Sequence, residues 1–338
     1  MSAAGTQRTP ATSRRSHEPA PPRDGCEGHK NRRGRGDRRG RARPAPAVPY
    51  LLVTPAVAVI SLVLGYPLYR LIVLSFQHYS LAEIISHKTN WLGLRNYQDI
   101  FSDQQFWAIL QRTAEFTAFN VGMTMLLGTG IAMLLRNVSG WVRLLVNIAM
   151  VFVWATPVVV AVTVWQWLVD QQSGVLNYLL THVLHAGNFG RHNWFGNPLS
   201  GFAIISALVI WGALPFVVIT LYAGVSQVPR ELEEAARVDG ATSWGVFRHV
   251  VYPIIKPLFL IVASLSVIWD FGVFNQVYIM LNARPTSSYY LMSIYSYQES
   301  FGVGQYGKGA AIAMVIVVVL LVAAFFYIRQ LLRIGEIK

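Results

Sequence analysis

The chain has little of what a soluble or disulfide-bonded protein needs. Only 13% of its 338 residues are charged, and Cys26 is the single cysteine. A lone cysteine excludes a disulfide within the chain and a cluster of thiolate metal ligands. Hydrophobic residues make up 54% of the chain. This composition indicates a polytopic membrane protein and argues against a soluble core.

Acidic residues are also scarce, and the basic charge is concentrated at the N-terminus. Of the net charge of +12, residues 1–49 contribute +8, from twelve Lys or Arg and four acids. This segment is rich in Arg, Gly, Pro and Ser, so we expect a disordered basic cytoplasmic tail. Nucleic-acid binding by residues 32–43 is an alternative interpretation. An anchor beside anionic membrane lipid, with no nucleic acid bound, is favoured.

Six long apolar runs follow the tail. About 20 helical residues cross the ~30 Å of hydrocarbon in a bilayer. The predicted spans are residues 50–76, 112–135, 144–168, 200–223, 258–281 and 309–332. The expected fold is therefore all-α, a polytopic membrane protein in which residues 50–338 form one domain of six transmembrane helices.

Basic residues are distributed unevenly across this topology. The side of the membrane that holds the tail has 21 Lys or Arg: twelve in the tail, two after the second span, four in residues 228–257 and three at the C-terminus. The opposite side has 6. The positive-inside rule then places both termini and residues 228–257 in the cytoplasm.

Residues 228–257 are a polar stretch between two apolar spans, with the signals of two short helices. Gly240 can end the first helix at a positive φ, and Thr242 or Ser243 can cap the second, which we expect Pro253 to end. Glutamates in the first turn favour the positive end of a helix dipole.

One face of the first helix is predicted to be shallow. Under the i, i+3, i+4 rule it comprises Leu232, Ala235, Ala236 and Asp239. Two alanines on one face let another backbone come close.

These residues carry a resemblance to a known family. Glu234-Ala235-Ala236, three residues, Gly240, nine residues, then Val250-Val251-Tyr252-Pro253 is similar to the EAA motif of permease subunits in bacterial binding-protein-dependent ABC transporters. In that family the loop docks into a groove of a separate ATPase subunit. The resemblance therefore assigns ATPase coupling to Glu234, Ala235, Ala236, Gly240 and Pro253.

Other segments resemble the carbohydrate branch of this family, of the maltose-importer type. They are residues 65–77, 93–117, 267–280 and 289–315, and the resemblance covers residues 50–333. One departure is Leu281-Asn282-Ala283-Arg284-Pro285, where many sugar permeases carry Thr-x-Gly-Gly-Pro.

The resemblance also implies partners and a location. They are a second permease subunit, in a heterodimer, two ATPase subunits, an extracytoplasmic sugar-binding protein and a carbohydrate substrate. The chain is expected in the cytoplasmic membrane, as a transporter component and not an enzyme. No cofactor or metal is expected in this chain, because ATP and Mg are bound by the ATPases.

Polar residues inside the fifth span are candidates for the substrate pathway, because an intramembrane carboxylate is costly to bury. Asp270, Asn275 and Gln276 can accept hydrogen bonds from sugar hydroxyls. Trp165, Trp211 and Trp269 can stack on sugar rings. Positions 269, 272, 273 and 276 are expected on one helix face. Structural hydrogen bonding by Asp270 and bundle packing by the tryptophans are the alternatives.

Two other functions are compatible with six spans. An ion-coupled secondary transporter would show internal repeats, and none is evident. An importer for glycerol-phosphate or a polyol would want basic residues in the pathway, for which Arg70 is the candidate.

Overall fold

The computed structural model describes residues 47–88 and 90–335 of the chain. The described residues divide at Ala56 into two units, of which the larger begins at Val57. Residues 1–46 of the predicted tail lie outside the described residues. Residues 47–49, the last three of the predicted tail, begin helix α1 (Ala47–Ile60). This helix therefore starts before the expected boundary at residue 50.

The first span is formed by α1, a π-turn (Ser61–Gly65) and α2 (Tyr66–Ser75). Residues Tyr50–Ser75 are long and apolar enough to cross a membrane, which confirms the prediction for this segment.

A small hairpin follows the first span. Strand β1 (Gln77–His78) pairs antiparallel with β2 (Asn90–Trp91), and α3 (Leu81–Ser86) lies between them. Helix α4 (Arg95–Ser102) supports the hairpin because the buried Asn96 Nδ2 donates to the carbonyls of Ser75, at 2.9 Å, and Gln77, at 3.0 Å.

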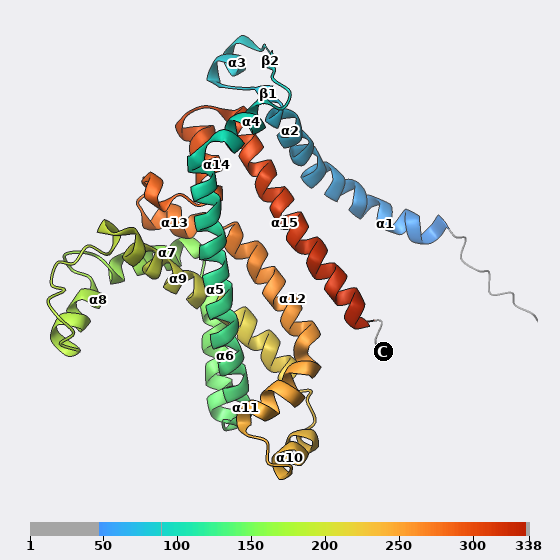
Figure 1. Cartoon of the computed structure of the whole chain (residues 1–338), viewed down its shortest axis with the longest axis vertical. Helices are drawn as coiled ribbons and strands as arrows, with labels where there is room; N and C mark the ends of the chain where they lie inside the picture. The colour runs from blue at the N-terminus through green and yellow to red at the C-terminus, as the bar shows by residue number, and fades with distance from the viewer. Residues whose placement is uncertain (1–46, 89, 336–338) are drawn as a thin grey trace, which may run out of the picture. The chain divides into compact units, whose positions relative to one another are not determined.

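Four long helices pack together in the Val57–Lys338 unit (Figure 1). They are α5 (Gln104–Asn137), α9 (Pro198–Val225), α12 (Tyr252–Phe271) and α15 (Tyr306–Gly335). Helices α5 and α9 approach closely at Gly128, where an added Cβ would lie 2.6 Å from Val217 Cγ1. Small residues of this kind allow tight packing between membrane helices, where no hydrophobic effect drives association.

The third predicted span is not one helix. Helices α6 (Gly140–Ala155) and α7 (Val158–Leu168) meet at an angle of 101°. Pro157 forces the preceding Thr156 into an extended conformation, with ψ 122°, and this ends α6. The described residues therefore contain five span-length apolar helices, and a sixth span only if the bent pair is counted as one.

A short set of elements follows α7. Helix α8 (Val175–Tyr178), a π-turn (Leu179–Val183) and a 3₁₀ turn (Trp194–Gly196) lead into α9.

The fifth predicted span is also shorter than expected. Helix α12 ends at Phe271, and α13 (Asn275–Met280) begins as a separate helix. The expected face through positions 269, 272, 273 and 276 is therefore wrong, because the helix stops between them. A 3₁₀ turn (Ser287–Tyr289), α14 (Met292–Tyr297) and a π-turn (Gln298–Gly302) then lead into α15.

Candidate functional site

The EAA-like loop lies at the end of the bundle where α5 finishes and α12 starts (Figure 1). It contains α10 (Arg230–Val238) and α11 (Ser243–Val246). Between them Gly240 adopts φ +87°, and Thr242 Oγ1 accepts a hydrogen bond of 3.2 Å from the Gly245 N–H. The predicted glycine turn and N-cap are both confirmed.

Pro253 does not end the second helix, contrary to the prediction. Helix α11 continues through a π-turn (Phe247–Val251) into α12, and the Tyr252 N–H donates to the Phe247 carbonyl. Pro253 lies at the start of α12, directly after the π-turn, so the helix passes through this proline without ending. The loop is thereby connected directly to α12.

The loop has a small apolar core of its own. Its buried members are Val225, Val228, Val246, Val251 and Ile255. Ala236 packs against this core, whereas Leu232, Ala235 and Asp239 are exposed. The expected shallow face is thus divided between the loop core and the surface. Glu234 is exposed as well.

A buried ion pair joins the loop to α5, and the sequence analysis did not identify it. Arg136 Nη1 contacts Glu233 Oε1, and Arg136 Nη2 donates to the Val228 carbonyl at 2.8 Å. The side chains of Arg136 and Glu233 are only 9% and 11% exposed. The sequence offers one signal for this pair: an acidic residue next to Glu234 and a basic residue at the end of the second predicted span.

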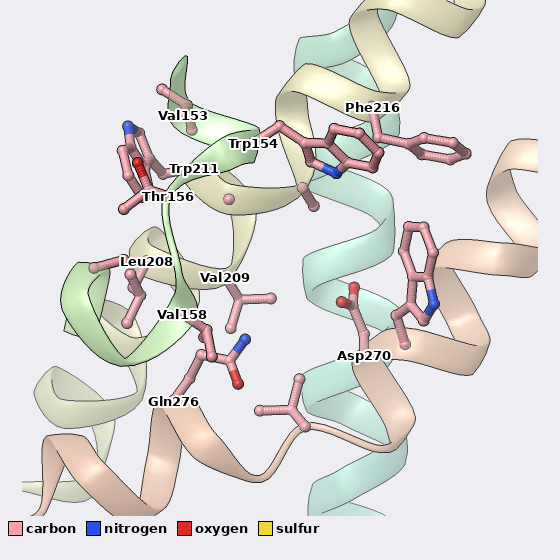
Figure 2. Close-up of a pocket in the computed structure, with 15 residues that line it drawn as sticks. Val153, Trp154, Thr156, Val158, Leu208, Val209, Trp211, Phe216, Asp270 and Gln276 are labelled. Carbon is pink, nitrogen blue, oxygen red and sulfur yellow. The ribbon is translucent and has the colours of Figure 1, made fainter. Parts of the chain in front are cut away.

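A cavity of about 330 Å³ lies among α6, α7, α9, α12 and α13 (Figure 2). Four of the six predicted pathway residues line it: Trp211, Trp269, Asp270 and Gln276. The other two do not line it. The Trp165 ring packs 6.2 Å from that of Trp211, between centroids, and Asn275 is exposed on α13.

Asp270 and Gln276 project into this cavity from two different helices (Figure 2). Asp270 is 4% exposed, and its Oδ2 has no hydrogen-bond partner among the described residues. A buried polar atom without a partner is costly, so a hydrogen-bond donor that reaches this carboxyl group would be stabilising. In the part of the chain that the structure describes, no group of three or more His, Cys, Asp or Glu is arranged to hold a metal ion.

The break between α6 and α7 contributes residues that the sequence analysis missed. Trp154 and Thr156 line the cavity at this break. Nearby, Gln166 Nε2 donates to the Ile279 carbonyl at 2.6 Å and to Asn282 Oδ1 at 3.2 Å, which connects α7 to α13 and the turn after it. Pro157 was the available signal, because proline within an apolar run often marks a broken helix.

Comparison with known proteins matches the chain to a family. Residues 124–333 match the family described as the binding-protein-dependent transport system inner membrane component. Over 305 residues the chain is 38% identical to the diacetylchitobiose uptake system permease protein DasB of Streptomyces coelicolor, with 90% of this chain and 93% of the relative covered. It is 28% identical to the trehalose/maltose transport system permease protein MalF of Thermococcus litoralis, with 67% and 74% covered.

The fold is also found in a solved structure. A crystal structure of a bacterial ABC transporter involved in the import of the acidic polysaccharide alginate contains a similar chain, with a TM-score of 0.70 at 20% identity. The similarity covers 84% of this chain and 94% of that one. At this identity the likeness supports the arrangement of helices.

Proposed function

This chain belongs to the family of inner membrane components of binding-protein-dependent transport systems, and from this premise we propose that it is the permease subunit of an importer for a disaccharide or oligosaccharide. The observation that carries the proposal is the cavity in which Asp270, Gln276, Trp211 and Trp269 come together. Carboxylate and amide groups accept hydrogen bonds from sugar hydroxyls, and indole rings cover the C–H faces of sugar rings. The 38%-identical relative named for diacetylchitobiose uptake supports a sugar substrate.

We propose that the energy comes from two ATPase subunits that hold the ATP and Mg, one of which docks on α10. The exposed surface of α10 supports this role, because Val238 is 87% exposed and Leu232 49% exposed. Together with Ala235 these side chains form a small apolar ridge that a groove on a partner can cover. In this proposal Glu234 contributes its charge to the docking surface, and Gly240 provides the backbone conformation of the turn after α10.

A second permease is proposed to cover an apolar groove along α5, forming a heterodimer. A groove of about 650 Å³ lies there, lined by α5, α11 and α12 residues that include Met125 and Phe259. Gly122 and Gly130 open onto it, with no heavy atom within 4 Å of an added Cβ. Small residues on an exposed membrane helix allow close packing by another helix.

The extracytoplasmic sugar-binding protein is proposed to dock at the far end, near the β1–β2 hairpin. In this proposed arrangement the chain lies in the cytoplasmic membrane with both termini in the cytoplasm. Basic residues at the α10 end support it, since Arg136 and Arg143 lie there with the loop.

Reconstitution of the complete importer in proteoliposomes tests the proposal. We expect ATP-dependent uptake of at least one of N,N′-diacetylchitobiose, trehalose and maltose, with glycerol phosphate excluded. Asp270→Ala should impair uptake while the complex still assembles. The variants Glu234→Lys and Ala235→Trp should abolish uptake, with the ATPases lost or uncoupled.

Two results would contradict the proposal. Uptake driven by an ion gradient without the ATPases would indicate a secondary transporter. Normal uptake by both loop variants would remove α10 from the coupling mechanism.

A further inference from the structure

Asp270 is the one ionisable side chain among the described residues that line the cavity. The polar groups beside it are neutral: Thr156, Gln276 and the indole N–H groups of Trp154, Trp211 and Trp269. The rest of the lining is apolar. In the described part of the chain, no Lys, Arg or His therefore lines this space.

The helices packed against α12 also leave the carboxyl group of Asp270 without a cationic partner. Helix α5 contributes buried hydroxyl and amide groups, at Thr117, Asn120 and Thr124. Arg112, the arginine of α5 nearest its start, donates to the Ser287 carbonyl at 3.0 Å and the Tyr290 carbonyl at 3.1 Å. No salt bridge to Asp270 occurs among the described residues.

We infer that the cavity selects its sugar by charge, accepting neutral or amino sugars and rejecting those that carry a carboxylate, sulfonate or phosphate. The inference rests on the proposed function and specifies the substrate class. An anionic group would enter this mostly apolar cavity with no cation to pair with it, and it would lie beside a carboxyl group whose ionised form repels it, so an anionic sugar is disfavoured. A hydroxyl or an ammonium group supplies the hydrogen bond that Asp270 Oδ2 lacks.

Equilibrium binding to the purified membrane complex tests the inference. The complex contains both permeases and the ATPases but no binding protein, so the selectivity of the binding protein does not contribute. Three probes share one disaccharide backbone: N,N′-diacetylchitobiose, deacetylated chitobiose, and the analogue with glucuronate in place of the terminal N-acetylglucosamine. Quenching of tryptophan fluorescence reports binding, because Trp154, Trp211 and Trp269 line the cavity.

We expect the glucuronate analogue to bind at least about tenfold more weakly than the neutral probe, which corresponds to one charge contact partly shielded by the protein. Asp270→Asn should narrow this gap and weaken the binding of deacetylated chitobiose. Gln276→Glu should widen the gap by adding a second carboxylate to the same cavity. Asp99→Asn, an exposed carboxylate on α4, is the matched control and should change none of the three affinities.

The outcomes separate this inference from the proposed function. Equal binding of the neutral and glucuronate probes to the wild-type complex would overturn the charge selection, as would a gap that Asp270→Asn leaves unchanged. Equal binding of these two probes would result if the second permease supplied a cation to the cavity. Absence of binding by all three probes would instead overturn the sugar pathway, and the charge selection with it.

Discussion

Arg136 and Glu233, 97 positions apart in the chain, form a buried ion pair that fastens α10 to the end of α5. Arg237 lies 3.9 Å from the second oxygen of the same carboxylate, one turn along α10. Helix α10 is therefore joined to α5 through this pair, and the loop continues into α12 through the helix after α11. The loop is connected to two membrane helices at once.

The first prediction concerns this pair. Arg136→Met leaves the Glu233 carboxylate buried without its partner, which should destabilise the loop by about 3 kcal/mol. We expect a lower melting temperature of the purified complex and reduced coupling of ATP hydrolysis to uptake. Exchanging the charges, with Arg136→Glu and Glu233→Arg together, should recover part of both losses.

Glu231→Gln is the control, because Glu231 lies on the same helix and is exposed. It should leave the melting temperature within error of the wild type. If Arg136→Met melts like the wild type, the pair does not hold the loop.

The second prediction concerns the glycine turn. An added Cβ at Gly240 meets no atom within 4 Å, so a substitution there is opposed by the backbone at φ +87° and not by crowding. Gly240→Val should cost about 1–2 kcal/mol or more and abolish transport, whereas Gly240→Asn, which tolerates this conformation better, should keep part of it. Uptake assays on inserted complexes measure this order. Gly245→Ala, whose Cβ would make ordinary contacts at 3.5 Å, should be tolerated.

The third prediction follows from a left-handed residue in the turn after α13. Ala283 has φ +58°, and its N–H donates to the Tyr278 carbonyl at 2.8 Å, closing the end of the helix. Ala283→Gly should stabilise the protein by about 1 kcal/mol, because glycine adopts this conformation without strain. The opposite sign is expected for Ala108→Gly on an exposed position of α5. Melting curves of the two variants that shift in the same direction would contradict this interpretation.

The fourth prediction concerns pH and the hairpin. The pKa of Glu83 is lowered from 4.5 to about 2, first by the hydrogen bond from the Ser80 hydroxyl and then by His78. A lowered pKa means that the folded hairpin favours the ionised carboxylate. The stabilisation is therefore present above pH 4.5 and is lost as the pH falls toward 2.

Amide exchange in α3, corrected for intrinsic rates, should accelerate over this interval in the wild type. Glu83→Gln should show the faster exchange at neutral pH and no further step on acidification. A step of the same size in Glu83→Gln would assign the transition to another group.

The fifth prediction tests the proposed orientation. In a Cys26→Ser background, single cysteines at Ser139 and Ser243 should be protected from an impermeant thiol reagent in intact cells, while one at Ser287 should react. All three positions are in the described residues and are exposed or half-buried. Labelling of the cysteine at position 243 from outside the cell would contradict the proposed topology.

Local signals in the sequence were sufficient for the elements that depend on neighbouring residues. The length of an apolar run determines whether it spans a bilayer, which holds for α1 with α2 and for α5, α9 and α15. The turn at Gly240 and the cap at Thr242 follow from the backbone freedom of glycine and the hydrogen bonding of a threonine hydroxyl, both of which act within four residues.

Only the tertiary structure decided the relationships between residues distant in the chain. Pro157 signals a break in the sequence, but the 101° angle at that break, the end of α12 at Phe271 and the passage of the helix through Pro253 are seen only in the structure. The Arg136–Glu233 pair and the cavity are of the same kind. Four of six candidate side chains reach the cavity because α9, α12 and α13 converge there, and periodicity within one span contains no information about that convergence.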